Sequence, residues 1–170
     1  MEKHWTDKLM ALCACSEAIE WARNYPTLMA AWEACERGDW MLWLAGKVCR
    51  TLPQRKRLVL AACACARTAL RYVKVGEKRP RAAIRTAERW AHGDRSVSLQ
   101  DVRSAADAAI AVYAAYAAYA VTSAAAAYDA ATYAAYAVTS AAAAYAVRTK
   151  TLARMAKIVR KHYPTPPRMR

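Results

Sequence analysis

Residues that break helices are nearly absent from this chain, and no other feature constrains its fold as strongly. Only 4 Gly and 6 Pro occur among the 170 residues, and none falls between residues 94 and 163. Ala, the strongest helix former, fills 43 positions. A many-stranded β protein needs Gly and Pro for its turns. We therefore predict an all-α fold, a compact single domain over residues 1–170 with about seven or eight bundled helices and a core of small side chains.

Capping residues, prolines and glycines mark the expected helix boundaries. Thr6 and Thr27 can each cap a helix, Pro53 and Pro80 suit first turns, and Gly93 suits a helix end. The sequence Ser-Leu-Gln-Asp that begins at residue 98 has the capping-box pattern and starts a sixth helix. The five helices expected before it cover residues 6–23, 27–38, 39–50, 53–73 and 80–93. The chain thus divides into three sections: short capped helices over 1–97, Ala/Tyr-rich helices over 98–147, and a basic helix and tail over 148–170.

The middle section contains a duplicated unit with a period of 17 residues, since the sequence of residues 119–128 returns at 136–145. An unbroken helix from Ser98 to Tyr163 would be about 100 Å long, so we expect at least one break. A tyrosine recurs every three residues at Tyr113, Tyr116 and Tyr119. These rings are expected to fill space between helices, and a row of phenols facing a ligand is the alternative. Residues 108–128 carry no charge, but Ala and Tyr favour insertion little and we expect no membrane span.

The formal net charge of +14 is concentrated in two segments. Residues 51–100 carry a net +9 and residues 148–170 a net +8, whereas residues 1–50 and 101–147 carry −1 and −2. Because like charges repel one another, such a distribution predicts an anionic partner, such as nucleic acid, a nucleotide, an acidic protein surface or an anionic membrane. A surface that only maintains solubility is the alternative.

Arginine recurs every four residues at Arg81, Arg85 and Arg89, which places a stripe along one face of the helix expected over 80–93. A second group ends the preceding helix, and we expect the two groups to converge in a zone without acidic partners. Guanidinium groups bind phosphate through paired hydrogen bonds, and indole rings stack on bases. The candidate ligand-binding residues are Arg67, Arg71, Lys78, Arg79, Arg81, Arg85, Arg89, Trp40, Trp43 and Trp90. Solvated faces for the arginines and core packing for the tryptophans are the alternatives.

The last helix, expected over residues 148–163, has two faces. The apolar face is made of Leu152, Met155, Ala156, Val159 and Tyr163. The opposite face carries a secondary basic surface, and no acidic residue follows residue 147 to offset it. That surface consists of Lys150, Arg154, Lys157 and Lys161.

Cysteine and histidine form no recognisable catalytic or metal site. Cys13 and Cys15, like Cys63 and Cys65, are two residues apart, so on a helix their sulfurs point about 200° apart. We expect buried, reduced thiols and no metal ion. Phosphate-binding glycine motifs are absent. We therefore expect no catalytic residue, no cofactor and no enzyme activity. Because no basic-then-apolar leader opens the sequence, a cytoplasmic location is expected.

Two segments carry a resemblance to a known family. Residues 32–47 read WEACERGDWMLWLAGK, and residues 79–94 read RPRAAIRTAERWAHGD, which fits the pattern R-P-x-x-A-I-x-x-A-x-x-W-A-x-G-[DE] before an Ala-rich tail. The chain resembles the Ala-rich helical proteins of phages and bacteria that carry the label immunity proteins. The resemblance covers most of the chain after Met10. It implies a role in conflict between phages, bacteria and their toxins, in the cytosol of the host bacterium.

We interpret the chain as a non-enzymatic protein that captures an anionic, nucleotide-like immune signal with its Arg and Trp residues. One alternative is an immunity-type protein that covers an acidic toxin or defence protein. A second alternative is nucleic-acid binding, in which the basic last helix takes part. A long Ala/Tyr helix can be shared between subunits, so a homo-oligomer is expected in each case.

Overall fold

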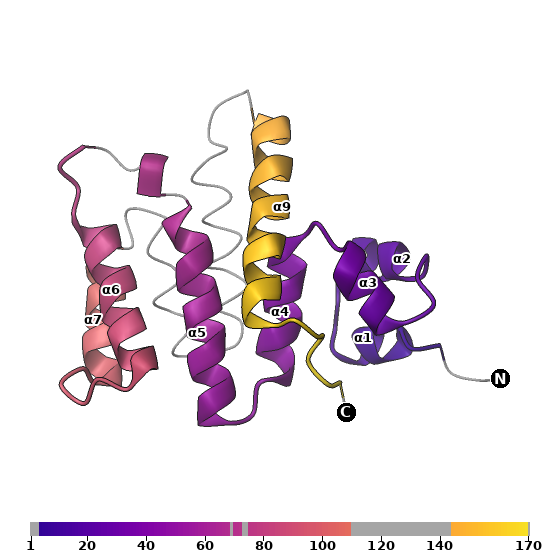
Figure 1. The fold of residues 1–170 in the computed structure, drawn as a ribbon, viewed down its shortest axis with the longest axis horizontal. Helices are drawn as coiled ribbons and strands as arrows, with labels where there is room; N and C mark the ends of the chain where they lie inside the picture. The colour runs from indigo at the N-terminus through magenta and orange to yellow at the C-terminus, as the bar shows by residue number, and fades with distance from the viewer. Residues whose placement is uncertain (1–3, 69, 73–74, 110–143, 170) are drawn as a thin grey trace.

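The computed structural model describes residues 4–68, 70–72, 75–109 and 144–169, and in these ranges it contains helices and no strand (Figure 1). The prediction of an all-α fold is confirmed. A short 3₁₀ helix over Leu70–Tyr72 follows α5. The α-helices of the described part are α1 (Asp7–Ala11), α2 (Ser16–Ala22), α3 (Leu28–Ala34), α4 (Gly38–Val48), α5 (Leu52–Arg67), α6 (Arg79–His92), α7 (Leu99–Ala109) and α9 (Ala144–His162).

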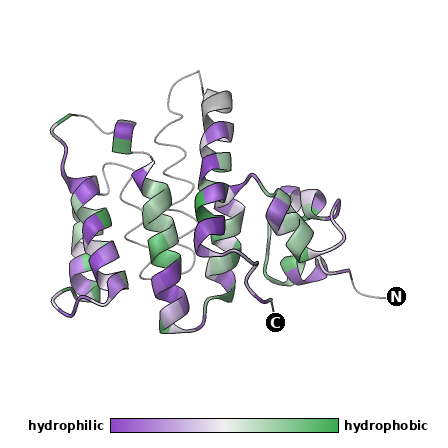
Figure 2. Ribbon diagram, viewed as in Figure 1, coloured by the Kyte–Doolittle hydropathy of each residue, from purple (hydrophilic) through white to green (hydrophobic). Residues whose placement is uncertain are grey.

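Helix α5 occupies the middle of the bundle, with α6 and α7 on one side and α4 and α9 on the other (Figure 1). Helices α1 to α3 form a separate small cluster at the far end, beyond α4. Figure 2 shows α5 hydrophilic at its beginning and hydrophobic along its second half. That half presents buried Ala61, Ala62, Cys63, Cys65 and Ala66 to its neighbours. Small side chains therefore line this half of α5, while larger ones, among them Leu58, Ile84 and Met155, are fully buried around them.

The helix predicted over residues 6–23 is two helices, because the chain turns sharply between α1 and α2. Cys13 has a φ of +62°, in the left-handed region that an L-residue rarely adopts. Both Cys13 and Cys15 lie in this loop and are exposed, so the prediction that they are buried is wrong. Cys63 and Cys65 on α5 are buried, as predicted.

Contacts with α9 explain why α3 ends at Ala34 and does not reach residue 38. The carbonyls of Trp32 and Cys35 lie at the end of α3, where carbonyls have no intrahelical partner. The Arg160 guanidinium donates to both of them, at 3.1 and 2.7 Å. The Trp32 indole N–H donates in turn to the Tyr163 carbonyl at 3.0 Å. A tertiary contact thus sets a boundary that local sequence does not mark.

Other helix ends follow local capping. Asp101 and Ser98 form the predicted capping box, with the Ser98 hydroxyl accepting from the Asp101 N–H at 3.1 Å. Thr51 and Gln54 form a second one at the start of α5. Helix α5 ends at Arg67, before the predicted residue 73, and α9 begins at Ala144, before the predicted residue 148.

Helix α9 packs tightly against the beginning of α4. The predicted apolar face of α9 is buried, with Met155, Ala156 and Val159 at 0% exposure. A Cβ placed on Gly38 would lie 2.6 Å from the Ala156 nitrogen and from the Met155 Cβ. Only a glycine therefore allows this close approach of the two helices.

Both copies of the 17-residue repeat lie almost entirely in residues 110–143, outside the described residues. The predicted tyrosine row and the predicted helix break fall there too, as does nearly all of the uncharged stretch 108–128. Among the described residues, no helix is both long enough and apolar enough to cross a membrane.

Candidate functional site

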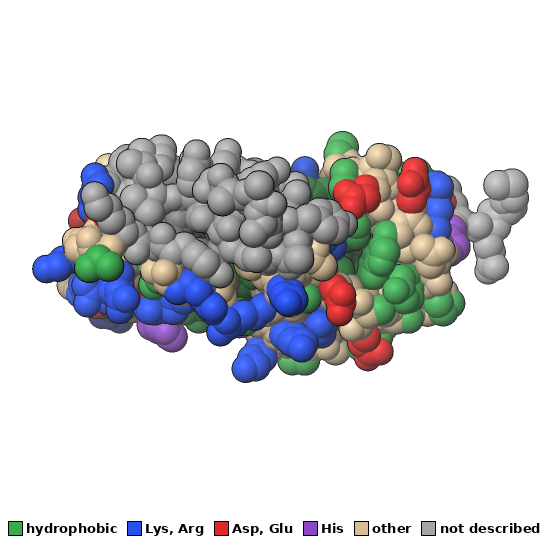
Figure 3. All heavy atoms as spheres, turned by 90° about the horizontal axis from the view of Figure 1, so that it is seen from above, with side chains coloured by type: hydrophobic (Ala, Val, Ile, Leu, Met, Phe, Trp, Pro, Cys, Tyr) green, Lys and Arg blue, Asp and Glu red, His purple; other side chains and the backbone are tan. Residues whose placement is uncertain are grey.

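Lys and Arg side chains gather in a band across α6, α5 and α9, while the α1–α3 end shows more Asp and Glu (Figure 3). The two positively charged segments of the sequence therefore share one face of the molecule. The Arg57 guanidinium on α5 lies 5.6 Å from the ring centre of Tyr163, at the end of α9. We call basic band the exposed residues Arg57, Arg81, Arg85, Lys150, Arg154, Lys157 and Lys161.

The α9 part of the basic band is a straight row. Lys150, Arg154, Lys157 and Lys161 are separated by four, three and four residues, so their side chains fall on one face over about 16 Å. All four are exposed, opposite the buried face of α9, as the two-sided pattern predicted. No acidic residue occurs in residues 148–170.

Three of the candidate arginines have acidic partners, so the expectation of a zone without them is wrong. Arg67 on α5 donates to both carboxylate oxygens of Glu88 on α6, at 2.7 and 2.5 Å. Arg79 donates to Glu77 at 2.8 Å and Arg89 to Asp94 at 2.8 Å. The few acidic residues of this region lie where α6 begins, ends or faces α5, and each is within reach of one arginine.

Hydrogen bonds keep two of these acidic partners ionised. Those donated by Arg79 lower the pKa of Glu77 to about 2. Those donated by Ser96 and, to a smaller extent, by Arg89 lower the pKa of Asp94 to about 2. At neutral pH, Arg79 and Arg89 are therefore partly neutralised by their partners.

The other predicted basic residues are differently placed. Arg81 and Arg85 are exposed on α6 and form no ion pair within the described part of the chain. Lys78 is exposed at the N-cap of α6. The Arg71 Nε donates to the Thr68 carbonyl at 3.3 Å, beside the end of α5. The convergence predicted for the two arginine groups is thus limited to the Arg67–Glu88 contact between α5 and α6.

Two of the three candidate tryptophans lie apart from the candidate arginines of α6. Trp40 and Trp43 lie on α4, which α5 separates from α6 (Figure 1). Trp90 is on α6 and half-buried, with the Lys56 ammonium 5.8 Å from its ring centre. The structure therefore does not bring the predicted arginines together with Trp40 and Trp43.

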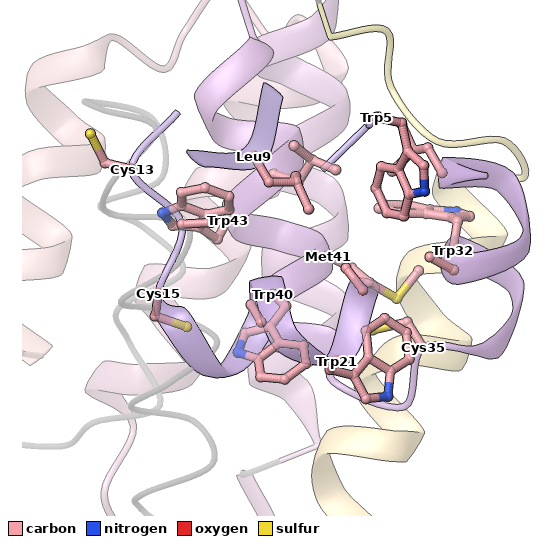
Figure 4. A pocket seen from close by; sticks show the side chains of 16 residues that line it. Trp5, Leu9, Cys13, Cys15, Trp21, Trp32, Cys35, Trp40, Met41 and Trp43 are labelled. Atoms are coloured by element: carbon pink, nitrogen blue, oxygen red, sulfur yellow. The ribbon is translucent and has the colours of Figure 1, made fainter. Parts of the chain in front are cut away.

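Trp40 and Trp43 instead line an apolar cavity of about 240 Å³ that lies between α1, α2, α3 and α4 and is open to solvent on one side (Figure 4). We call it the tryptophan cavity, because five indole rings contribute to its wall: Trp5, Trp21, Trp32, Trp40 and Trp43. Sequence reasoning missed Trp5, Trp21 and Trp32. A signal was present, since five of the six tryptophans fall within the first 43 residues.

Charged groups near the tryptophan cavity are paired with one another outside it. Arg37 donates to Asp39 at 2.9 and 2.7 Å and to Glu17 at 3.0 Å, and its guanidinium lies 4.1 Å above the Trp40 ring. Asp39 is 2% exposed. None of these three lines the cavity. In its wall, burial raises the pKa of Cys35 to about 11, so this thiol is protonated and unreactive at neutral pH.

Within the described ranges, no group of three or more His, Cys, Asp and Glu side chains is arranged to hold a metal ion. The site is thus a basic band on one face and a tryptophan cavity at one end. Comparison of the chain with family models, curated proteins and solved structures gives no match, so the family resemblance remains a prediction.

Proposed function

We propose that this protein binds nucleic acid non-enzymatically, through contacts between the basic band and the phosphate backbone. The observation that carries the proposal is the row of four exposed cations on α9, in a band of Lys and Arg side chains that Figure 3 shows continuing over α5 and α6. Arg81 and Arg85 are exposed on α6, like the four cations of the row on α9. These cations have no acidic partner in the described part of the chain. Their mutual repulsion lowers stability, and a polyanion relieves that repulsion.

The dispersion of the charges favours a polymer over a nucleotide. The row on α9 is about 16 Å long, and α6 lies about two interhelical spacings away, or about 18 Å. One nucleotide is too small to contact both ends of such a surface. A duplex carries one phosphate charge per about 1.7 Å of its axis, so it matches cations spread over this area.

Capture of a nucleotide, as predicted from the sequence, requires the candidate arginines and the candidate tryptophans to contact the same ligand. The arginines of α6 lie on the far side of α5 from Trp40 and Trp43. A base stacked on those rings would leave its phosphates far from Arg81 and Arg85. Nucleic acid, the second of the alternatives raised from sequence, therefore fits the geometry better.

The test measures binding of a short fluorescein-labelled DNA duplex by fluorescence anisotropy over a range of salt concentrations. The logarithm of the affinity should fall linearly with the logarithm of salt concentration, with a slope of about −0.9 per phosphate contacted. The triple variant Arg154→Glu, Lys157→Glu, Lys161→Glu should bind about a hundredfold more weakly.

A matched control separates the basic band from net charge. The triple variant Lys8→Glu, Arg23→Glu, Lys47→Glu changes the net charge equally, but its three positions are exposed on α1, at the C-cap of α2 and on α4, at the tryptophan end. It should retain most of the affinity, and circular dichroism should show intact helices in both variants. Equal losses in both variants, or tight binding to an acidic protein but not to DNA or RNA, would contradict the proposal.

A further inference from the structure

We infer that the tryptophan cavity is a binding site for a small, uncharged, planar aromatic molecule. This inference is independent of the basic band, which lies on other residues and another face. The size of the cavity and the chemistry of its wall both restrict the kind of molecule that can bind there.

The volume sets the size of the ligand. A dry apolar cavity of about 150 Å³ accepts benzene, and pockets for drug-sized molecules begin at about 300 Å³. The tryptophan cavity, at about 240 Å³, lies between these limits. It therefore fits a molecule of about two or three rings.

The wall sets the polarity of the ligand. Trp, Leu, Met, Ala and Cys residues line the cavity, and no charged residue lines it. Two cations lie against rings of the wall without lining the cavity: Arg37, which is held by Asp39 and Glu17, and Lys47, whose ammonium is 5.6 Å from the Trp43 ring centre. A charged ligand would lose its hydration without gaining a counter-ion, whereas flat apolar rings would stack on indoles.

Three tryptophans differ from those that only support the fold. The indole N–H groups of Trp5 and Trp32 donate to backbone carbonyls, those of Tyr25 and Tyr163. In the described part of the chain, Trp21, Trp40 and Trp43 make no such bond, and each ring is partly exposed. Figure 4 shows Trp40 and Trp43 side by side along α4, facing the loop of Cys13 and Cys15. The Trp21 and Trp40 rings contact each other, with 5.8 Å between their centres, and Arg37 covers one face of Trp40. These contacts fix the rings at the cavity wall, where a flat ligand can stack on them.

The test uses N-phenyl-1-naphthylamine, a neutral probe whose fluorescence rises on transfer from water to an apolar site. Binding to the full chain should saturate at one probe per protein and quench tryptophan emission by energy transfer. The Ala18→Phe variant places a ring in the cavity wall and should weaken probe binding about tenfold or more. Ala82→Phe is the matched control, since Ala82 is equally half-buried but lies on α6, and it should bind the probe normally.

Further measurements keep the inference falsifiable. If Ala18→Phe loses its helical circular dichroism, Trp43→Leu replaces it and should weaken probe binding as well. Neutral 2-naphthamide should displace the probe at about tenfold lower concentration than anionic 2-naphthoate at high salt. The absence of saturable binding, equal binding by the cavity variants, or stronger displacement by the anion would overturn the inference. Probe binding that falls as protein concentration rises would overturn it too, because a second copy would then occupy the cavity.

Discussion

The α1–α4 end and the α5–α6–α9 face of this protein are packed in opposite ways. At the α1–α4 end, five indole rings surround space that they do not fill. Along α5, Ala and Cys side chains at 0–1% exposure bring the helices close and leave the charges outside. Large rings packed at angles leave gaps, whereas small side chains interdigitate well. The comparison shows that one chain can separate an apolar cavity from a basic surface by the size of its core residues.

Thiol reactivity should show the largest difference between the two regions. Cys13 and Cys15 are exposed in the α1–α2 loop, whereas Cys63 and Cys65 are 0% exposed and burial raises their pKa. The α5 thiols should react with iodoacetamide only after unfolding, about a thousandfold or more slowly. Mass spectrometry of peptides from a time course measures both rates. Simultaneous labelling of all four would contradict the buried core.

The junction of α4 and α9 gives the next largest effect. Gly38→Val would force side-chain atoms against the α9 backbone and should lower the free energy of unfolding by about 3 kcal/mol. Lys47→Val, at an exposed position of the same helix, should change it by less than about 0.5 kcal/mol. Urea unfolding followed by circular dichroism gives both values. Similar midpoints for the two variants would show that the close approach does not matter.

The two regions should also differ in how much an ion pair contributes to the free energy of unfolding. Asp39 is buried and accepts hydrogen bonds from Arg37, so Asp39→Ala should cost about 2 kcal/mol by leaving a half-buried guanidinium with only the exposed Glu17 as an acidic partner. The Arg67–Glu88 pair is more exposed, and Glu88→Ala should cost less than about 1 kcal/mol. Urea unfolding compares the two, and an equal cost would contradict their different burial.

The pH dependence of stability gives the smallest effect. Partial burial, and then the Arg57 guanidinium, lower the pKa of His162 below its ordinary 6.5. Below pH 6.5 the unfolded chain therefore binds a proton at this site that the folded chain does not, so stability is full above pH 6.5 and declines as pH falls. The decline between pH 6.5 and 5 should be shallower in His162→Gln, measured by urea unfolding. A steeper decline of stability in the variant would contradict a lowered pKa of His162 in the folded protein.

Local signals predicted the fold better than they predicted the site. Capping at Ser98, the glycine after α6 and the apolar face of α9 depend on neighbouring residues, and the structure agrees with each. The end of α3 depends on Arg160, which is 125 residues away from Cys35 in the sequence. Likewise, the cavity depends on how α1, α2 and α4 pack, and no spacing between Trp21 and Trp40 encodes that. The end of α3 and the tryptophan cavity both depend on contacts between residues distant in the sequence, and the periodicity of the sequence does not predict such contacts.

The hydrogen bonds between the α3 segment and the α9 segment have a consequence for how the protein folds during its synthesis. Trp32 and Tyr163 are 131 residues apart, yet their hydrogen bond and that of Arg160 complete the α1–α4 end. A ribosome synthesises that end long before it synthesises α9. The tryptophan-lined helices must therefore wait, incompletely packed, until α9 has been made. Folding of the α1–α4 end should follow the synthesis of α9, with apolar rings exposed to chaperones in the meantime.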